Sequence, residues 1–263
     1  MLKRLLTAGI GVILFFCVLP APVKVFNIAV LIITVGAVYE INNAVTKRLS
    51  LKITGMLSAA LVFVGMITGY LIPAIMITAA LYIILSVVLF GREKVWDIYM
   101  LGFAGIMFSA FLSTLALLKS EYSAYVVILP FLFAWITDSG AYFTGVSIGK
   151  HKLAPTLSPK KTIEGAVGGI VFCIIISVVY MIIAKHGFDF ILFEENAYIN
   201  IVVLSASASV VSQLGDLASS AIKRDYNIKD YGNILPGHGG ILDRFDSVVF
   251  TAPFVYYLLS IIK

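Results

Sequence analysis

Long runs of apolar residues alternate with short polar segments along this chain. Nine runs can be read, approximately Leu5–Leu19, Val25–Tyr39, Ile53–Gly69, Leu71–Phe90, Ile98–Leu118, Ala124–Tyr142, Gly165–Ala184, Ala197–Ile222 and Val248–Ile262. A helix needs about 17–25 apolar residues to cross a bilayer. The runs are continuous, whereas the strands of a membrane barrel alternate apolar and polar residues. The pattern therefore predicts an all-α fold, a polytopic transmembrane bundle of about nine membrane-spanning helices.

Composition supports this interpretation. Of the 263 residues, 60% are hydrophobic and 13% are charged, whereas soluble domains carry about 25% charged residues. The net charge of +5 is better explained by loop orientation and anionic lipid than by nucleic acid, which we do not expect as a partner. Cys17 and Cys173 both lie inside apolar runs, so we interpret them as packing residues rather than a disulfide.

The basic residues predict how the chain is oriented. The first run resembles a signal peptide as well as a membrane helix, and we retain it as a helix because the loop charges then alternate. With the N-terminus in the cytoplasm, fifteen of the nineteen Lys and Arg residues fall on the inner side and four on the outer side. Cytoplasmic loops are enriched in Lys and Arg. We therefore expect a cytoplasmic N-terminus and an external C-terminus.

The polar residues concentrate in the second half of the chain. Two long polar segments, Gly149–Glu164 and Lys223–Asp246, lie on the predicted inner side. We expect residues 1–122 to be scaffold helices and residues 123–263 to form a catalytic region with two cytoplasmic polar loops.

Carboxylates flank the second polar segment. Asp216 shares a helix face with Ser220 and Lys223, and Asp243 shares a face with Asp246. Several carboxylates near basic residues are typical of a magnesium site that also binds phosphates. A single aspartate in a first helical turn can instead be a simple cap. An aspartate inside a span usually faces a polar cavity or a partner.

Two further features suggest phosphate binding. In the segment Pro236-Gly-His-Gly-Gly240, glycines would let backbone amides approach a phosphate, although the segment can also be a flexible turn. Ser158-Pro159 predicts a helix start. Lys160 and Lys161 would then oppose the helix dipole unless an anion binds there; the alternative is that they only fix the topology. Asp138, inside the sixth run, is a candidate site residue or a hydrogen-bond partner of Tyr142.

These motifs carry a family resemblance. The segment Ser219–Asp246 resembles the signature of the phosphatidate cytidylyltransferases, or CDP-diacylglycerol synthases. The matching residues are Ser220, Lys223, Arg224, Lys229, Asp230, His238, Gly239, Gly240, Asp243, Arg244 and Asp246. The region from Asp138 to Gly165 is similar to a second block of that family and includes Ser158-Pro-Lys-Lys-Thr162. The first six helices match only in general hydropathy.

The resemblance implies a reaction between CTP and phosphatidic acid that yields CDP-diacylglycerol and pyrophosphate in phospholipid biosynthesis. It implies Mg²⁺, with room for a second cation, held by Asp216, Asp243 and Asp246. It further implies catalytic roles for these aspartates with Lys223 and Arg224. The implied substrate-binding residues are Asp138, Ser158, Lys160, Lys161, Ser220, His238, Gly239, Gly240 and Arg244.

Two alternatives stay open at this point. A CTP-dependent lipid kinase of the polyprenol or dolichol type would share a CTP site but release CDP. An ion-coupled transporter would also use intramembrane aspartates. For the enzyme, we expect the plasma membrane of a prokaryote, with the active site at the cytoplasmic face. Whether the chain forms a homodimer is left open.

Overall fold

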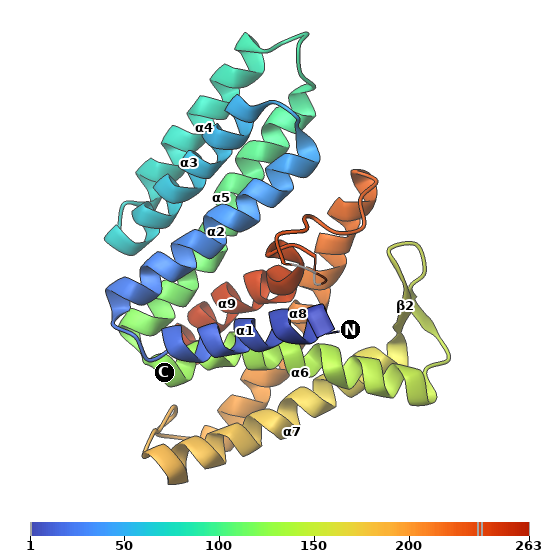
Figure 1. Ribbon diagram of the computed structural model, residues 1–263. Helices are drawn as coiled ribbons and strands as arrows, with labels where there is room; N and C mark the ends of the chain where they lie inside the picture. Colours follow the sequence, from blue (N-terminus) through green and yellow to red (C-terminus); the bar gives the residue numbers. More distant parts are fainter. Residues whose placement is uncertain (1, 236, 238, 263) are drawn as a thin grey trace. The chain divides into compact units, whose positions relative to one another are not determined.

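The computed structural model describes residues 2–235, 237 and 239–262. In this part of the chain there are nine α-helices and one short β-hairpin, which confirms the predicted all-α bundle (Figure 1). Eight helices, α2 to α9, are long and apolar enough to cross a membrane, and α1 has a shorter apolar stretch, Gly9–Val18. The chain is therefore a multi-pass membrane protein. The helices are α1 Leu2–Val18, α2 Val23–Val45, α3 Leu49–Thr68, α4 Leu71–Val88, α5 Val95–Glu121, α6 Ala124–Ile148, α7 Ile163–Phe188, α8 Ala197–Asp225 and α9 Leu242–Ile262.

The chain divides into two compact units. The N-terminal unit comprises Met1–Ser120 and Asp225–Phe245, and the C-terminal unit comprises Glu121–Arg224 and Asp246–Lys263. The segment that joins α8 to α9 thus packs with the first helices of the chain. The division of function at residue 122 stays a prediction, because these units are defined by packing alone.

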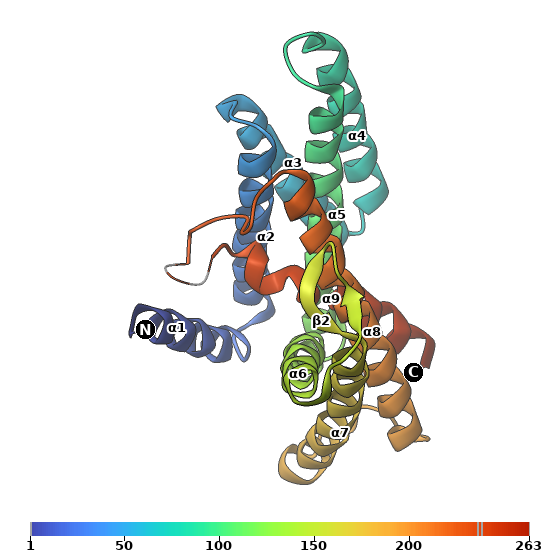
Figure 2. The same cartoon turned by 90° about the vertical axis from the view of Figure 1, so that its right-hand side faces the viewer.

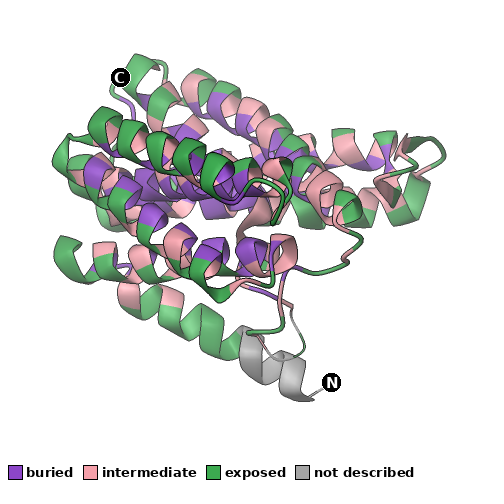
Figure 3. Ribbon diagram, turned by 90° about the horizontal axis from the view of Figure 1, so that it is seen from above, coloured by how far each residue is buried: buried purple, intermediate pink, exposed green. Residues whose placement is uncertain are grey.

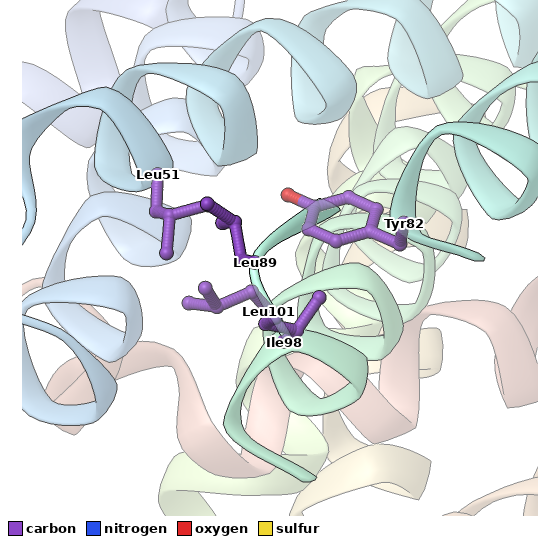
Figure 4. Close-up of a cluster of buried hydrophobic side chains, with 5 residues drawn as sticks. All are labelled: Leu51, Tyr82, Leu89, Ile98 and Leu101. Carbon is purple, nitrogen blue, oxygen red and sulfur yellow. The ribbon is translucent and has the colours of Figure 1, made fainter. Parts of the chain in front are cut away.

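The N-terminal unit is held by contacts between neighbouring helices. A buried cluster joins Leu51 on α3, Tyr82 on α4, Leu89, and Ile98 with Leu101 on α5 (Figure 4). In contrast, many large apolar side chains on the outward helix faces are exposed (Figure 3). Exposed apolar faces are expected where lipid, rather than water, surrounds a helix.

In the C-terminal unit, α6 and α7 lie side by side along their lengths (Figures 1 and 2). Small residues make this approach close: a Cβ atom on Gly165 would lie 2.7 Å from the carbonyl oxygen of Ala141, and one on Gly169 would lie 2.8 Å from that of Thr137. Small residues four apart allow membrane helices to pack backbone to backbone. Gly165 and Gly169 of α7 therefore pack within the chain, against α6.

The hairpin between these helices corrects one prediction. Strands β1, Lys152–Ala154, and β2, Ser158–Thr162, pair in antiparallel fashion, so Ser158 and Pro159 do not begin a helix. Helix α7 begins instead at Ile163, where the hydroxyl of Thr162 accepts the amide of Gly165 at 3.1 Å and acts as the N-cap. Because the backbone groups of β2 are paired with β1, the N-cap is Thr162 and not Ser158, four residues earlier in the sequence. Lys160 and Lys161 consequently lie on a strand and not at a helix N-terminus.

The carboxylate of Glu164 closes the base of the hairpin. It accepts the backbone amides of Lys150, at 3.0 Å, and His151, at 3.2 Å. It also contacts Nδ1 of His151 at 2.5 Å. In addition, the amide of Ile163 donates to the carbonyl of His151 at 2.9 Å. These bonds fix the hairpin, and hence Lys160 and Lys161, to the start of α7.

Candidate active site

An ion pair connects the hairpin to α8. The ammonium of Lys161 on β2 contacts the carboxylate of Asp216, and both side chains are 23% exposed. Asp216 lies on α8, one turn before Ser219 and Ser220. Both residues of the pair belong to the C-terminal unit. The structure therefore brings the Ser158–Thr162 motif together with Asp216, the carboxylate that precedes the second polar segment.

Two further carboxylates share this region. Asp246 on α9 lies 3.9 Å from the ammonium of Lys223 on α8, and both side chains are mostly buried. Asp138 on α6 interacts electrostatically with Asp216 and Lys161, and Asp246 interacts with Asp216 and Asp138. Three carboxylates from three helices thus repel one another, while Lys161 and Lys223 balance part of their charge.

The chemistry of these side chains fits a hard divalent cation. Mg²⁺ prefers oxygen ligands and keeps several waters, so one or two protein carboxylates suffice when phosphates complete its coordination. Among the described residues, no group of three His, Cys, Asp and Glu side chains is arranged to hold a metal by itself. Asp216 and Asp246 could therefore contribute ligands to a metal that a bound triphosphate also coordinates.

A cavity of about 460 Å³ lies beside the ion pair, between α6, the hairpin and α7. Three lysines line it, Lys152, Lys160 and Lys161, together with Asp138 and Gln213. Its remaining wall is largely apolar and is formed by Ala141, Tyr142, Gly145, Val146, Leu153, Thr162, Gly165 and Ala166. A cavity with cationic and apolar parts suits an amphiphile that has an anionic head group.

The rest of the predicted site lies in the N-terminal unit. Oδ2 of Asp243 accepts the amide of Gly240 at 3.0 Å and that of Tyr231 at 2.8 Å. Glu40, on α2, accepts the amides of Ile241 at 2.9 Å and Leu242 at 2.8 Å. The amides of residues 240–242 are thus bonded to carboxylates of the protein. The phosphate-binding role of the segment Pro236–Gly240 stays a prediction, and of its amides that of Gly240 is bonded to Asp243.

A second contact anchors the same segment. The hydroxyl of Tyr226 donates to Asp97 on α5 at 3.3 Å. Burial and the neighbouring carboxylate of Asp97 raise the pKa of Tyr226 to about 12, so its hydroxyl keeps its proton at neutral pH. The segment between α8 and α9 is therefore tied to α5 at one end and to α2 at the other.

The predicted site residues are distributed over both units. The C-terminal unit holds Asp138, Ser158, Lys160, Lys161, Asp216, Ser220, Lys223, Arg224 and Asp246. The N-terminal unit holds Gly239, Gly240, Asp243 and Arg244. The predicted residue His238 lies outside the described residues. Asp216 and Asp246 are brought together in one unit, whereas Asp243 belongs to the other.

Three polar residues escaped the sequence interpretation: Glu40, Lys152 and Gln213. Glu40 and Gln213 both lie within spans, and an intramembrane polar residue is a site candidate by default. The same rule that selected Asp138 could therefore have found Gln213, whereas Glu40 lies one residue beyond the predicted run Val25–Tyr39. Gln213 donates to the carbonyl of Ala166 at 3.1 Å, which links α8 to α7 beside the cavity. No sequence signal distinguished Lys152 from the other basic loop residues.

The fold and the site define a multi-pass membrane protein with a carboxylate- and lysine-rich polar region within its helices. The chain matches the Cytidylyltransferase family over residues 2–262, and it belongs to that family. It is 35% identical to the phosphatidate cytidylyltransferase of Staphylococcus aureus (strain COL), over 97% of this chain and 98% of that protein. It is 32% identical to that of Staphylococcus haemolyticus (strain JCSC1435), with the same coverage.

A third relative matches more closely over a shorter region. The phosphatidate cytidylyltransferase of Bacillus subtilis (strain 168) is 50% identical over 127 residues, which is 48% of this chain and 44% of that protein. None of these three relatives bears the name of a lipid kinase or a transporter. The family resemblance that the motifs predicted is therefore confirmed.

Proposed function

We propose that the chain is a phosphatidate cytidylyltransferase, an enzyme that transfers a cytidylyl group from CTP to phosphatidic acid. The family and the names of its relatives support this activity. The observation in the structure that carries the proposal is the contact between Lys161 and Asp216 beside an amphipathic cavity. This contact supports the proposal, because an anionic lipid and a metal-bound nucleotide would need a fixed cation and a carboxylate close together.

The reaction replaces one bond to phosphorus by another. A phosphate oxygen of phosphatidic acid forms a bond to the α-phosphorus of CTP. The bond from that phosphorus to the bridging oxygen of the β-phosphate breaks, and pyrophosphate carries away the electron pair. The attacking oxygen is already an anion, so the site needs no strong base. The protein must instead align the two anions and offset their repulsion.

The lysines of the hairpin suit the lipid substrate. Lys152, Lys160 and Lys161 would hold the phosphate of phosphatidic acid through charge-assisted hydrogen bonds. The apolar wall of the cavity, which includes Tyr142 and Val146, would contact the acyl chains. Asp216 keeps the ammonium of Lys161 in place, so this cation is oriented before the lipid arrives.

The nucleotide would be held by the signature residues. We assign CTP and the leaving pyrophosphate to Lys223, Arg224 and Arg244, with Ser220, His238 and Gly239 as further contacts, following the family resemblance. Mg²⁺ would be held by Asp216 and Asp246, and by Asp243 in the resemblance, and it would neutralise the phosphates. Lys223 lies 3.9 Å from Asp246, so with a metal on that carboxylate its ammonium would bind a phosphate of the nucleotide.

The proposal includes an orientation in the plasma membrane of a prokaryotic cell. The charge distribution supports a cytoplasmic N-terminus and a cytoplasmic site, where a water-soluble nucleotide meets a lipid head group. Cysteines introduced one at a time at Lys229 and Lys185, in a chain with Cys17→Ser and with only the buried Cys173 left, test it with an impermeant thiol reagent applied to intact cells. Only Lys185→Cys should react, and labelling of both positions from one side would contradict the orientation.

The activity is tested with purified protein in nanodiscs. With CTP and phosphatidic acid, we expect equal amounts of pyrophosphate and CDP-diacylglycerol, measured by an enzyme-coupled assay and by mass spectrometry. Diacylglycerol and a polyprenol, offered in separate reactions, should give no turnover. Release of CDP with a phosphorylated lipid would establish a lipid kinase instead.

A further inference from the structure

Glu40 is a buried carboxylate that the proposed reaction does not use. It lies on α2, within a span, and is 1% exposed. Among the described residues, no Lys or Arg side chain forms an ion pair with it. A buried charge is costly unless hydrogen bonds satisfy it. Its role is therefore set by the backbone groups that it binds.

Those groups belong to the start of α9. Oε1 of Glu40 accepts the amide of Ile241 at 2.9 Å, and Oε2 accepts the amide of Leu242 at 2.8 Å. Leu242 is the first residue of α9. The first amides of a helix have no partner within it, and a negative charge near them also complements the helix dipole. Glu40 thus caps α9 from another helix, about two hundred residues earlier in the chain.

Two glycines fit closely around this carboxylate. A Cβ atom on Gly240 would lie 2.3 Å from Oε2 of Glu40, and one on Gly232 would lie 2.6 Å from Oε1. Any side chain at either position would displace the carboxylate or the backbone. The close approach of Glu40 therefore explains why a glycine stands at position 240, the second glycine of the signature, independently of any substrate.

The same backbone also holds Asp243. Its Oδ2 accepts the amide of Gly240, while Glu40 accepts the next two amides, those of Ile241 and Leu242. The two carboxylates thus bind three consecutive amides. Since Asp243 follows Leu242 directly, a movement of this backbone would move the Asp243 carboxylate with it.

We infer that Glu40 is a positioning residue of the cytidylyl transfer, an inference that rests on the proposed function of Asp243. Its carboxylate on α2 fixes the amides of Ile241 and Leu242 and so the start of α9 and the orientation of Asp243. Glu40 itself touches neither substrate nor metal. A residue of this kind acts on turnover more than on the affinity for the lipid.

The test compares Glu40→Gln, Glu40→Asp and Glu40→Ala with the control Glu93→Gln. Glu93 is a carboxylate of the same unit, paired with Arg48 at 3.0 Å. Gln keeps the size of Glu40, but its NH₂ group would face an amide donor, so one bond is lost. We expect Glu40→Gln to lower kcat on the order of 10- to 100-fold, the effect of a displacement of about 1 Å. The KM for phosphatidic acid should change by less than about twofold, because the substitution removes no group that binds the lipid in the ground state.

A readout independent of activity accompanies the kinetics. Hydrogen–deuterium exchange of the amides of Ile241 and Leu242 should accelerate in Glu40→Gln and Glu40→Ala and stay unchanged in Glu93→Gln. Glu40→Asp retains the charge and should recover part of both the protection and kcat. If Glu40→Ala does not fold, the comparison of Glu40→Gln with Glu40→Asp still tests the inference.

The outcomes separate the two proposals. Faster exchange with an unchanged kcat would reduce Glu40 to a structural cap and overturn the inference, as would unchanged exchange in all three variants. A parallel loss of kcat and of amide protection, with recovery by Glu40→Asp, supports it. If the wild-type protein transfers no cytidylyl group, the proposed function fails, and the exchange data still decide whether Glu40 holds the amides.

Discussion

Lys161 and Asp216 form an ion pair that joins β2 to α8 within the C-terminal unit. The pair connects the Ser158–Thr162 motif to the helix that leads into the signature. Both side chains are largely shielded from solvent, so the contact is screened less than a surface pair. It orients a cation on the wall of the cavity that the lipid substrate is proposed to occupy.

Removal of this cation should impair catalysis more than folding. We expect Lys161→Met to lower kcat/KM for phosphatidic acid by roughly one to two orders of magnitude, since a hydrogen bond to a charged group contributes about 1.5–3 kcal/mol. The matched control is Lys185→Met, which removes an exposed lysine at the far end of α7. Lys160→Met should raise the KM alone, because the exposed Lys160 has no fixed partner among the described residues. Equal kinetics for all three variants would mean that the hairpin lysines only fix the topology.

The metal hypothesis is tested at Asp216 and Asp246. Each substitution to Asn keeps the shape of the side chain and removes its charge. We expect Asp216→Asn and Asp246→Asn to lower turnover by at least about 100-fold, as the loss of a preorganised charge in a site typically does. Excess Mg²⁺ should restore little, because a ligand is missing, and a chelator should inactivate the wild type. Asp189→Asn, outside the site, is the control.

A result against the metal hypothesis would be equally clear. Full activity of the wild type in a chelator would exclude a divalent cation. Near-normal activity of either variant would exclude that carboxylate as a ligand. Size-exclusion profiles in detergent should be unchanged for both variants, since neither side chain is in the apolar core.

Much of the fold could be predicted from the sequence, because each span needs only length and hydrophobicity. The start of α7 could not, since Ser158 and Pro159 carry a helix-start signal that the pairing of β2 with β1 overrides. The contact between Lys161 and Asp216 depends on how α6, α7 and α8 pack, which local patterns do not encode. The partner of Glu40 was equally hidden, because its contacts are with backbone amides, and these carry no residue-specific signal.

Packing of α6 on α7 provides a prediction about stability. Gly169→Val should destabilise the protein by about 1–3 kcal/mol, the usual cost of overpacking, because even its Cβ would lie 2.8 Å from the carbonyl oxygen of Thr137. Gly187→Val is the control on the same helix, where a Cβ would meet nothing within 4 Å. Thermal unfolding in detergent should show a lower Tm for Gly169→Val only. Equal Tm values would mean that the two helices are not in this close contact.

The final prediction concerns the fit of Gly232 around Glu40. Gly232→Ala places a methyl group 2.6 Å from Oε1 of Glu40 if nothing moves, so the carboxylate must shift away from the amides of Ile241 and Leu242. In a chain that already carries Glu40→Ala, the same methyl group meets no carboxylate. The two substitutions should therefore be non-additive, with a coupling on the order of 0.5–3 kcal/mol. Gly9→Ala is the control, because a Cβ atom at Gly9 would meet nothing within 4 Å. Gly91→Ala is unsuitable as a control, because Gly91 has a φ of 77° that disfavours any residue with a side chain. Unfolding free energies and kcat for the two single variants and the double variant provide the cycle. Additive effects in both quantities would show that Gly232 does not depend on Glu40, and the close fit of this segment around the carboxylate would have to be abandoned.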